Sequence, residues 1–235
     1  MDQLLVALDV DSADEAIELS NQLRDVVGGF KIGSRLFTAE GPAVVHKMVK
    51  RGDKIFLDLK YHDIPSTVAG AVHAARNLGV WMLTVHASGG ADMLRAAKEA
   101  AGEIECGPRI IAVTVLTSLN NLALSQLGIT NSITEQVDYW TQLARDAGTD
   151  GVVVSPWEIE RTRAKFGAKF TIVTPGIRDQ ATQILKDDQN RTRSATEAVK
   201  AGANYLVVGR PIVAASNPRA AAIQLCKKIA KVSQG

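Results

Sequence analysis

Eight short runs of aliphatic and β-branched residues recur along the chain, with helical patterns between them. Most of the runs lie about 25–35 residues apart, the length of a strand followed by a helix. The predicted strands are Leu4–Leu8, Phe30–Ile32, Ile55–Leu59, Met82–His86, Ile110–Val115, Gly151–Val154, Phe170–Val173 and Tyr205–Val208. Strands that alternate with helices form parallel sheets, and eight such units close into a (β/α)8 barrel, the TIM barrel.

Helix boundary signals support this alternation. Ser12 and Glu15 predict a capping box at the start of a helix over Ala13–Leu23. Pro42 and Pro65 stand at the first positions of two helices that end near Gly52 and Gly79. The other predicted helices are Ala91–Ala101, Thr134–Ala147, Pro156–Phe166, Ser194–Ala201 and Pro218–Val232.

The chain length and the absence of a low-complexity linker favour one barrel domain over residues 1–235. The alternative, a doubly wound open sheet, should carry a glycine-rich dinucleotide turn after its first strand. Asp9-Val10-Asp11-Ser12 has no such turn. The least regular stretch runs from Gly176 to Arg193, and we expect a lid loop at about 177–193 because loops of this length in a domain are commonly functional.

The overall charge argues against a protein that binds a nucleic-acid polymer. Lys and Arg number 27 and Asp and Glu number 25, for a net charge of +2 without a five-residue basic run. Binding to a nucleic-acid polymer would need a basic patch. The uncharged stretch Ile110–Thr134 is rich in polar residues and contains Gly128, so we expect a buried strand and a polar loop, not a membrane span.

The two cysteines, Cys106 and Cys226, lie far apart and form no C-x-x-C motif. They predict buried or half-buried thiols, not a disulfide framework or a zinc site. The run Leu4–Leu8 is too short for the apolar segment of a signal peptide. We therefore expect a cytoplasmic protein.

Charged residues stand at the ends of the first three predicted strands, where a barrel places its active site. Asp9 follows the first strand, Lys31 lies in the second, and Asp58 and Lys60 end the third. Strand side chains alternate, so all four should point into the barrel. Ordinary ion pairs at the solvent-exposed end of the barrel are the simpler interpretation. Four charges of alternating sign at the same end of the barrel favour a functional site. Asp63, three residues beyond Lys60, adds a carboxylate nearby.

A lysine flanked by carboxylates is held in its ammonium form. Lys60 is therefore suited to donate a proton and stabilise a carbanion, whereas a Schiff-base lysine needs a free amine. Two ammonium groups in the cluster also oppose a divalent cation. His62 and His86 lie close in sequence to strand ends, and we expect them to make polar contacts rather than to bind metal.

The last strand ends in Gly209 and Arg210, where barrels often bind phosphate. The glycine allows a phosphate to approach the backbone closely, and the arginine can bind the phosphate in a bidentate manner. Arg178, after the seventh strand, supplies a second cation. Ser88-Gly89-Gly90 is a competing anion site that a tight turn explains equally well.

The array Asp58-Leu59-Lys60-Tyr61-His62-Asp63-Ile64-Pro65 resembles the signature of the orotidine 5'-monophosphate decarboxylase family. D-x-K-x-x-D alone is shared with sister barrels that act on sugar phosphates. Further matching segments follow other strands in order: Ala7-Leu8-Asp9, Val85-His86-Ala87, Val115-Leu116-Thr117-Ser118, Thr174-Pro175-Gly176-Ile177-Arg178 and Val208-Gly209-Arg210-Pro211. Together they cover nearly the whole chain and make the resemblance specific.

The resemblance implies conversion of orotidine 5'-monophosphate to uridine 5'-monophosphate (UMP) and carbon dioxide, the last step of pyrimidine biosynthesis, without a cofactor or metal. Asp58 matches the position beside the substrate carboxylate, and Lys60 matches the position that protonates C6. Asp9 and Lys31 match positions that bind the ribose and support the charge array. Lys31, Asp58, Lys60 and Asp63 are thus the expected catalytic residues.

The resemblance also implies a homodimer with shared active sites. Asp63, Ile64 and Thr67 match positions that reach the neighbouring subunit's site. Gln189 matches a lid glutamine that bridges the base and the phosphate. Competing lid glutamines are Gln180 and Gln183.

The remaining matches concern the base and the phosphate. Thr117 matches the position that contacts the pyrimidine. Arg178, Gly209 and Arg210 match positions near the phosphate.

Two alternative functions remain at this point. One is a sister barrel that acts on sugar phosphates through a metal-stabilised enediolate, as a decarboxylase or an epimerase. The other is a non-catalytic barrel that senses a phosphate or nucleotide. The second has no use for a buried Asp-Lys-Asp array, whose desolvation is costly.

Overall fold

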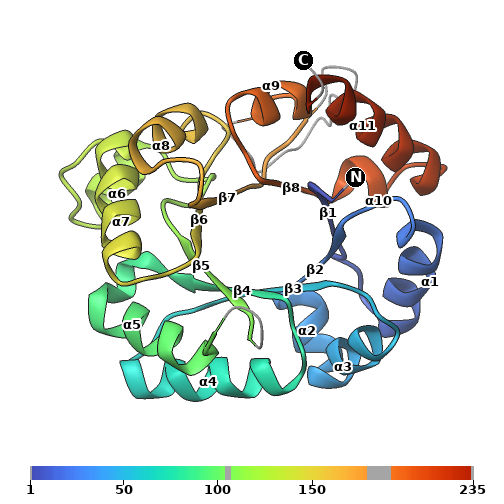
Figure 1. The fold of residues 1–235 in the computed structure, drawn as a ribbon, viewed down its shortest axis with the longest axis horizontal. Coiled ribbons are helices and arrows are strands. Elements are labelled where there is room, and N and C mark those ends of the chain that lie inside the picture. Colours follow the sequence, from blue (N-terminus) through green and yellow to red (C-terminus); the bar gives the residue numbers. More distant parts are fainter. Residues whose placement is uncertain (1, 104–106, 179–191, 234–235) are drawn as a thin grey trace.

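The computed structural model describes residues 2–103, 107–178 and 192–233. Eight parallel strands form a closed barrel in chain order, and helices surround it (Figure 1). The strands are β1 (Leu4–Ala7), β2 (Gly29–Gly33), β3 (Ile55–Tyr61), β4 (Met82–His86), β5 (Arg109–Val113), β6 (Gly151–Val153), β7 (Thr171–Thr174) and β8 (Tyr205–Val208). The predicted TIM barrel is confirmed, and no predicted strand end is displaced by more than two residues.

The helices pack on the outside of the barrel wall. They are α1 (Ala13–Leu23), α2 (Ser34–Glu40), α3 (Pro42–Lys50), α4 (Pro65–Asn77), α5 (Gly90–Ala101), α6 (Asn121–Gln126), α7 (Ile133–Asp146), α8 (Ile159–Phe166), α9 (Ala195–Lys200), α10 (Arg210–Val213) and α11 (Pro218–Ser233), with a short 3-10 helix, η1, at Ala87–Gly89. No helix in the described ranges combines the length and apolar character needed to cross a membrane.

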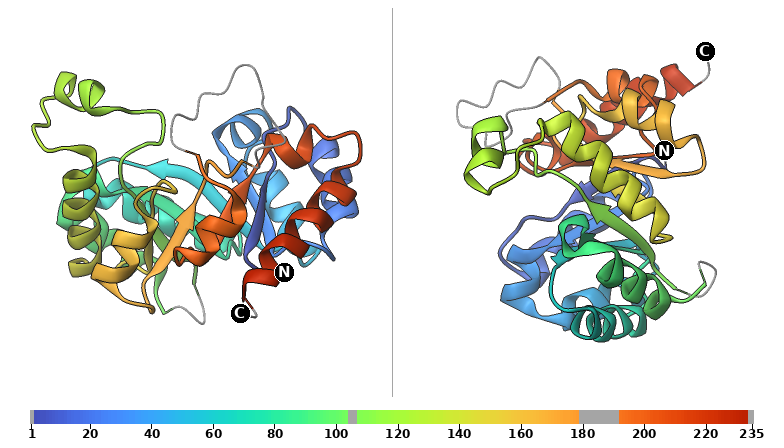
Figure 2. Two further views of the ribbon diagram at one scale, coloured as in Figure 1. Left: turned by 90° about the horizontal axis from the view of Figure 1, so that it is seen from above. Right: turned by 90° about the vertical axis from the view of Figure 1, so that its left-hand side faces the viewer.

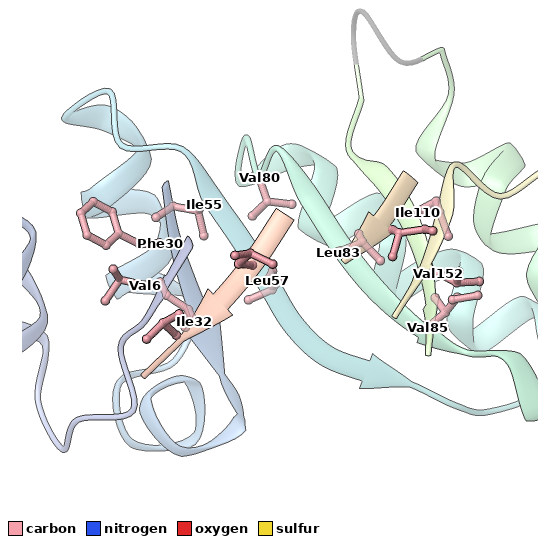
Figure 3. Packing of buried hydrophobic residues seen from close by; sticks show 14 of the residues in the cluster. Val6, Phe30, Ile32, Ile55, Leu57, Val80, Leu83, Val85, Ile110 and Val152 are labelled. Carbon is pink, nitrogen blue, oxygen red and sulfur yellow. The ribbon is translucent and has the colours of Figure 1, made fainter. Parts of the chain in front are cut away.

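Alternating strand residues divide the apolar core into two separate groups. The larger lies between strands and helices and includes Val6, Ile32 and Leu57, shown as sticks in Figure 3. The smaller fills the barrel interior and comprises Leu5, Ala7, Phe56, Met82, Ile111, Val173 and Val207. This confirms the inward and outward alternation predicted for the first three strands.

Three short helices, α2, α6 and α10, are absent from the predicted elements. The stretch predicted as a polar loop after β5 contains α6, because the Asn120 side chain accepts the N–H of Ala123 at 2.9 Å and caps a short helix. The helices α2 and α10 were not predicted; each is only one or two turns long and directly follows a strand. Figure 2 shows α6 projecting beyond the other helices.

One predicted helix start and one predicted helix cap also differ in detail. The helix predicted from Pro156 begins at Ile159, because the N–H of Glu158 bonds to the carbonyl of Ser155 at 3.1 Å in a turn. At α1, the Ser12 hydroxyl accepts the N–H of Glu15 at 3.2 Å, as predicted. The Glu15 carboxylate instead accepts the N–H of Asp11, so the capping box is only half formed.

Cys226 is a free, buried thiol, as predicted, and its Sγ donates to the carbonyl of Val26 at 3.4 Å. Burial raises its pKa. Cys106 lies outside the described residues.

Candidate active site

A pocket of about 400 Å³ opens at the carboxyl ends of the strands. Its volume suits a small ligand such as a nucleotide. Eight of the residues that the sequence singled out line it: Asp9, Lys31, Asp58, Lys60, Thr117, Arg178, Gly209 and Arg210. The pocket thus joins the charged strand ends of β1 to β3 with the predicted anion-binding residues after β7 and β8.

Four charged side chains form a continuous chain across one wall of the pocket. The Lys31 ammonium lies 3.3 Å from Asp9 Oδ1 and 3.4 Å from Asp58 Oδ2. The Lys60 ammonium lies 2.9 Å from the same Asp58 oxygen. The two inner members, Lys31 and Asp58, are nearly buried, whereas Lys60 is about one-third exposed. The array therefore presents an ammonium group to the pocket and keeps its carboxylate partner largely out of water.

Close packing around Lys31 depends on a glycine. A Cβ on Gly33 would lie 2.8 Å from the Lys31 ammonium nitrogen and 3.4 Å from Asp9 Oδ1. A larger residue would therefore displace the ammonium from its carboxylate partner. Gly33 is not among the residues predicted as functional from the sequence.

The Asp58 carboxyl is held as a carboxylate. Burial alone would raise its pKa, but the charges of Lys31 and Lys60 and hydrogen bonds from Lys60 and Thr84 lower it overall. His86 lies nearby, and burial, together with the charges of His62 and Lys60, lowers its pKa. The rings of His62 and His86 are 5.5 Å apart, so these histidines contact each other at the edge of the site.

An irregularity in β3 sets the position of Lys60. Leu57 pairs with Leu83 and Tyr61 with Val85, so four steps along β3 correspond to two steps along β4. Lys60 has a φ of 53°, the only positive value among non-glycine residues that the structure describes. Simple strand alternation predicts that Lys60 points inward but not that its backbone takes this left-handed conformation.

Two further cations, Arg178 and Arg210, lie after β7 and β8. Gly209 precedes α10, which Arg210 begins, and both line the pocket. Arg178 lies after β7, and its backbone N–H donates to the carbonyl of Arg193 at 3.0 Å. An isolated bridge between Ile177 and Arg193 joins the two ends of the predicted lid.

Some predicted residues lie elsewhere. Asp63, Ile64 and Thr67 are exposed and do not belong to the described residues lining this pocket. Ile64 is 64% exposed, although it is a large apolar residue. The three lid glutamines lie outside the described residues: Gln180, Gln183 and Gln189.

Several residues at the site were not predicted as functional. Leu116 and Ser118 line the pocket beside Thr117, and their place after a predicted strand was the available signal. Arg35, on α2, donates to the backbone carbonyl of Asp9 at 3.0 Å and to the Asp11 carboxylate at 2.7 Å. No local sequence pattern indicates this contact, because it joins α2 to the segment after β1, which come together only when β1 and β2 pair.

His, Cys, Asp and Glu side chains in the three described ranges form no group of three or more that could hold a metal ion.

The model of the "Orotidine 5'-phosphate decarboxylase / HUMPS family" matches residues 2–225. The chain belongs to this family. Orotidine 5'-phosphate decarboxylase of Saccharophagus degradans is 47% identical over 99% of this chain and 97% of its own. The enzyme of that name from Moorella thermoacetica is 48% identical, over 98% and 93%.

Two solved structures share this barrel. The crystal structure of orotidine 5'-phosphate decarboxylase from Lactobacillus acidophilus has a TM-score of 0.84 and 35% identity, with 96% of this chain and 98% of that chain covered. An uncharacterized conserved protein from Geobacillus kaustophilus has a TM-score of 0.83 and 32% identity. The resemblance inferred from the strand-end residues is therefore confirmed at the level of family and fold.

Proposed function

We propose that this chain decarboxylates orotidine 5'-monophosphate to UMP and carbon dioxide, the final step of pyrimidine nucleotide synthesis. The family and its near-full-length relatives support the reaction. The observation that carries the chemistry is the array in which Lys60 lies 2.9 Å from Asp58, itself held by Lys31. This array supplies a fixed ammonium group next to a fixed negative charge.

The ammonium of Lys60 is the proposed proton donor. When the bond between C6 and the carboxylate breaks, carbon dioxide leaves and the electron pair stays on C6, where no electron sink is available. A positive charge already in place stabilises this carbanion without reorganisation. Proton transfer from the Lys60 nitrogen to C6 then gives UMP and a neutral amine, which regains its proton from water.

Asp58 is the proposed neighbour of the substrate carboxylate. Lys31 and Lys60 keep it ionised, as its lowered pKa indicates. A carboxylate next to the substrate's own carboxylate raises the energy of the bound substrate, and the repulsion disappears when neutral carbon dioxide forms. Asp58 also holds the Lys60 ammonium at the reacting carbon.

The phosphate is assigned to the part of the pocket that follows β7 and β8. Arg178, Gly209 and Arg210 all line this part. A guanidinium group can form two hydrogen bonds to a phosphate dianion, and a glycine allows the phosphate to approach the backbone closely. We propose residues 177–193 as a lid that closes over it, since the bridge between Ile177 and Arg193 anchors both ends at the pocket rim. The free energy of phosphate binding can then drive closure of the lid, which holds the substrate in the arrangement that decarboxylation needs.

In our assignment the base and ribose occupy the rest of the pocket. Thr117 would contact the pyrimidine, and Asp9 and Lys31 would contact the ribose; all three line the pocket. Gln189 is proposed to bridge base and phosphate from the lid, in competition with the other two lid glutamines.

A homodimer is proposed to complete the site. Asp63, Ile64 and Thr67 are exposed beside the mouth and outside the pocket of their own chain. The exposed Ile64 side chain fits burial against a second copy. A cytoplasmic location completes the proposal, supported by the free thiol of Cys226.

The deciding experiment follows the absorbance of the orotate ring after mixing the protein with orotidine 5'-monophosphate in excess EDTA. We expect undiminished turnover and release of carbon dioxide. A family member that works on sugar phosphates through a metal-bound enediolate would leave the absorbance unchanged, and its activity on a keto-sugar phosphate would need added magnesium. Either of those results would refute the proposed function.

A further inference from the structure

Thr84 on β4 connects the two central groups of the charge array. Its side chain is completely buried. Its hydroxyl accepts the backbone N–H of Lys60 at 2.9 Å and lies 3.0 Å from Asp58 Oδ1, to which it donates. A single hydroxyl therefore contacts the backbone of one active-site residue and the carboxylate of the other.

This contact occurs where the β3–β4 ladder is irregular. Between the pairs Leu57–Leu83 and Tyr61–Val85, β3 contains two more residues than β4. There the side chain of Thr84 accepts the hydrogen bond from the Lys60 N–H. Lys60 also adopts a φ of 53°, which costs free energy for a residue with a Cβ. Such a conformation persists only where the surroundings hold it, and the Thr84 hydroxyl bonds the backbone of this residue directly.

We propose that Thr84 is a positioning residue for the decarboxylation: its hydroxyl fixes the backbone of Lys60 and the carboxylate of Asp58 in one arrangement. Thr84 is not among the described residues lining the pocket, so it acts through these two groups and not on the substrate. The inference rests on the proposed function and extends it to a buried residue on the neighbouring strand, β4. The hydroxyl must both accept and donate: it accepts a hydrogen bond from the Lys60 N–H and donates one to the Asp58 carboxylate.

The effect on Asp58 has a predictable sign. The groups that face this carboxylate are Lys31 from β2, Lys60 from its own strand, and Thr84 and His86 from β4. Losing the Thr84 hydroxyl removes one hydrogen bond that lowers the pKa of Asp58. The acid limb of kcat should therefore move to higher pH.

The test compares Thr84→Val, which keeps the shape and loses the hydroxyl, with Thr84→Ser, which keeps the hydroxyl. We expect Thr84→Val to lower kcat by roughly 10²-fold, the effect of misplacing a reacting group by about 1 Å, with KM changed less than about threefold. Thr84→Ser should restore kcat to within about threefold of the wild type. The valine variant should also show the shift of the acid limb.

Thr149→Val is the matched control. The Thr149 hydroxyl is buried and donates to the carbonyl of Ala144 at 3.0 Å, before β6 at the opposite end of the barrel. Its loss should lower thermal stability without changing kcat or the pH profile. If Thr84→Val does not fold, Thr84→Ala takes its place with the same expectations.

Three results would overturn the assignment: an unchanged kcat in the hydroxyl-free variant, an equal loss of kcat in Thr149→Val, or no rescue by serine. A wild-type protein that releases no carbon dioxide from orotidine 5'-monophosphate would instead refute the proposed function itself. The two failures are therefore distinguishable in one set of measurements.

Discussion

Lys60 donates a proton in our mechanism only if its ammonium group is held beside the reacting carbon. The 2.9 Å contact with Asp58 and the hydrogen bond from its backbone to Thr84 hold it from two directions. The residue types are visible in the sequence, whereas the conformation of Lys60 is not, because it arises from pairing between β3 and β4.

The first prediction concerns Lys60→Ala. Removing both the proton donor and the preorganised charge should lower kcat by roughly 10³-fold or more, since each effect alone is typically worth about 10²-fold or more. Steady-state kinetics measure the loss, and circular dichroism checks that the barrel stays folded. Lys47→Ala is the control, because this lysine is exposed and its contact to Asp14 is 3.9 Å. A kcat near the wild-type value would contradict the proton-donor assignment.

A second prediction uses Lys31→Met and the lowered pKa of Asp58. The lowered pKa means that the charged carboxylate stabilises the fold above the pKa of an unfolded Asp, about 3.9, and that this contribution is lost as pH falls through the folded value. Removing Lys31 takes away a charge that lowers this pKa. The acid limb of kcat should therefore move to higher pH.

The same variant should be less stable near neutral pH, by up to about 3 kcal/mol, because Lys60 remains as the only cation that the described residues place beside the buried Asp58 carboxylate. The stability difference should shrink as pH falls and Asp58 becomes neutral. Urea unfolding at several pH values measures it, alongside kcat from pH 4 to 8. An acid limb that stays in place would show that Lys31 does not control Asp58.

At the scale of elements, the long helices and all eight strands follow from periodicity and capping residues. The short helices α2, α6 and α10 do not, because one or two turns carry too little pattern and depend on contacts with neighbouring loops. This matters for function, since α10 begins with Arg210 and α6 follows the pocket residue Ser118.

The third prediction concerns the β8–α10 junction. Arg210→Ala should raise KM by about 10–100-fold, the value of one charge-assisted hydrogen bond, and should affect kcat less. Orotidine, which lacks the phosphate, should be turned over equally by the wild type and the variant. Arg95→Ala, an exposed arginine on α5, is the control. A KM that does not change would place the phosphate elsewhere.

At the scale of the whole molecule, barrel closure brings β1 next to β8. Asp9 and Gly209, two hundred positions apart in the chain, thereby line one pocket. The residues that the family resemblance assigns to a second subunit, Asp63 and Ile64, instead face outward. A complete site by our proposal therefore requires two chains.

The fourth prediction is complementation between inactive chains. A homodimer of Lys60→Ala chains and one of Asp63→Ala chains should both be inactive, but a mixed dimer contains one site with both residues intact. Random exchange at equal concentrations should restore about a quarter of the wild-type activity, since half of the dimers are mixed and each has one intact site.

The control for this experiment mixes Lys60→Ala with a chain that carries both substitutions. No pairing of these chains forms an intact site, so the activity should stay at background. An absence of rescue in the first mixture, after exchange has been verified by mass, would mean that each site is built within one chain.

The sequence by itself determined the barrel, the inward direction of Asp9, Lys31, Asp58 and Lys60, and the family. These properties depend on periodicity and on residue types near strand ends, which are local. Only the tertiary structure decided that Thr84 and Gly33 support the charge array, because Thr84 contacts it from β4 and Gly33 lies where the Lys31 ammonium approaches Asp9. Hydrogen bonds and close approaches between strands leave no periodic trace in a chain, and they set the distances on which the chemistry depends.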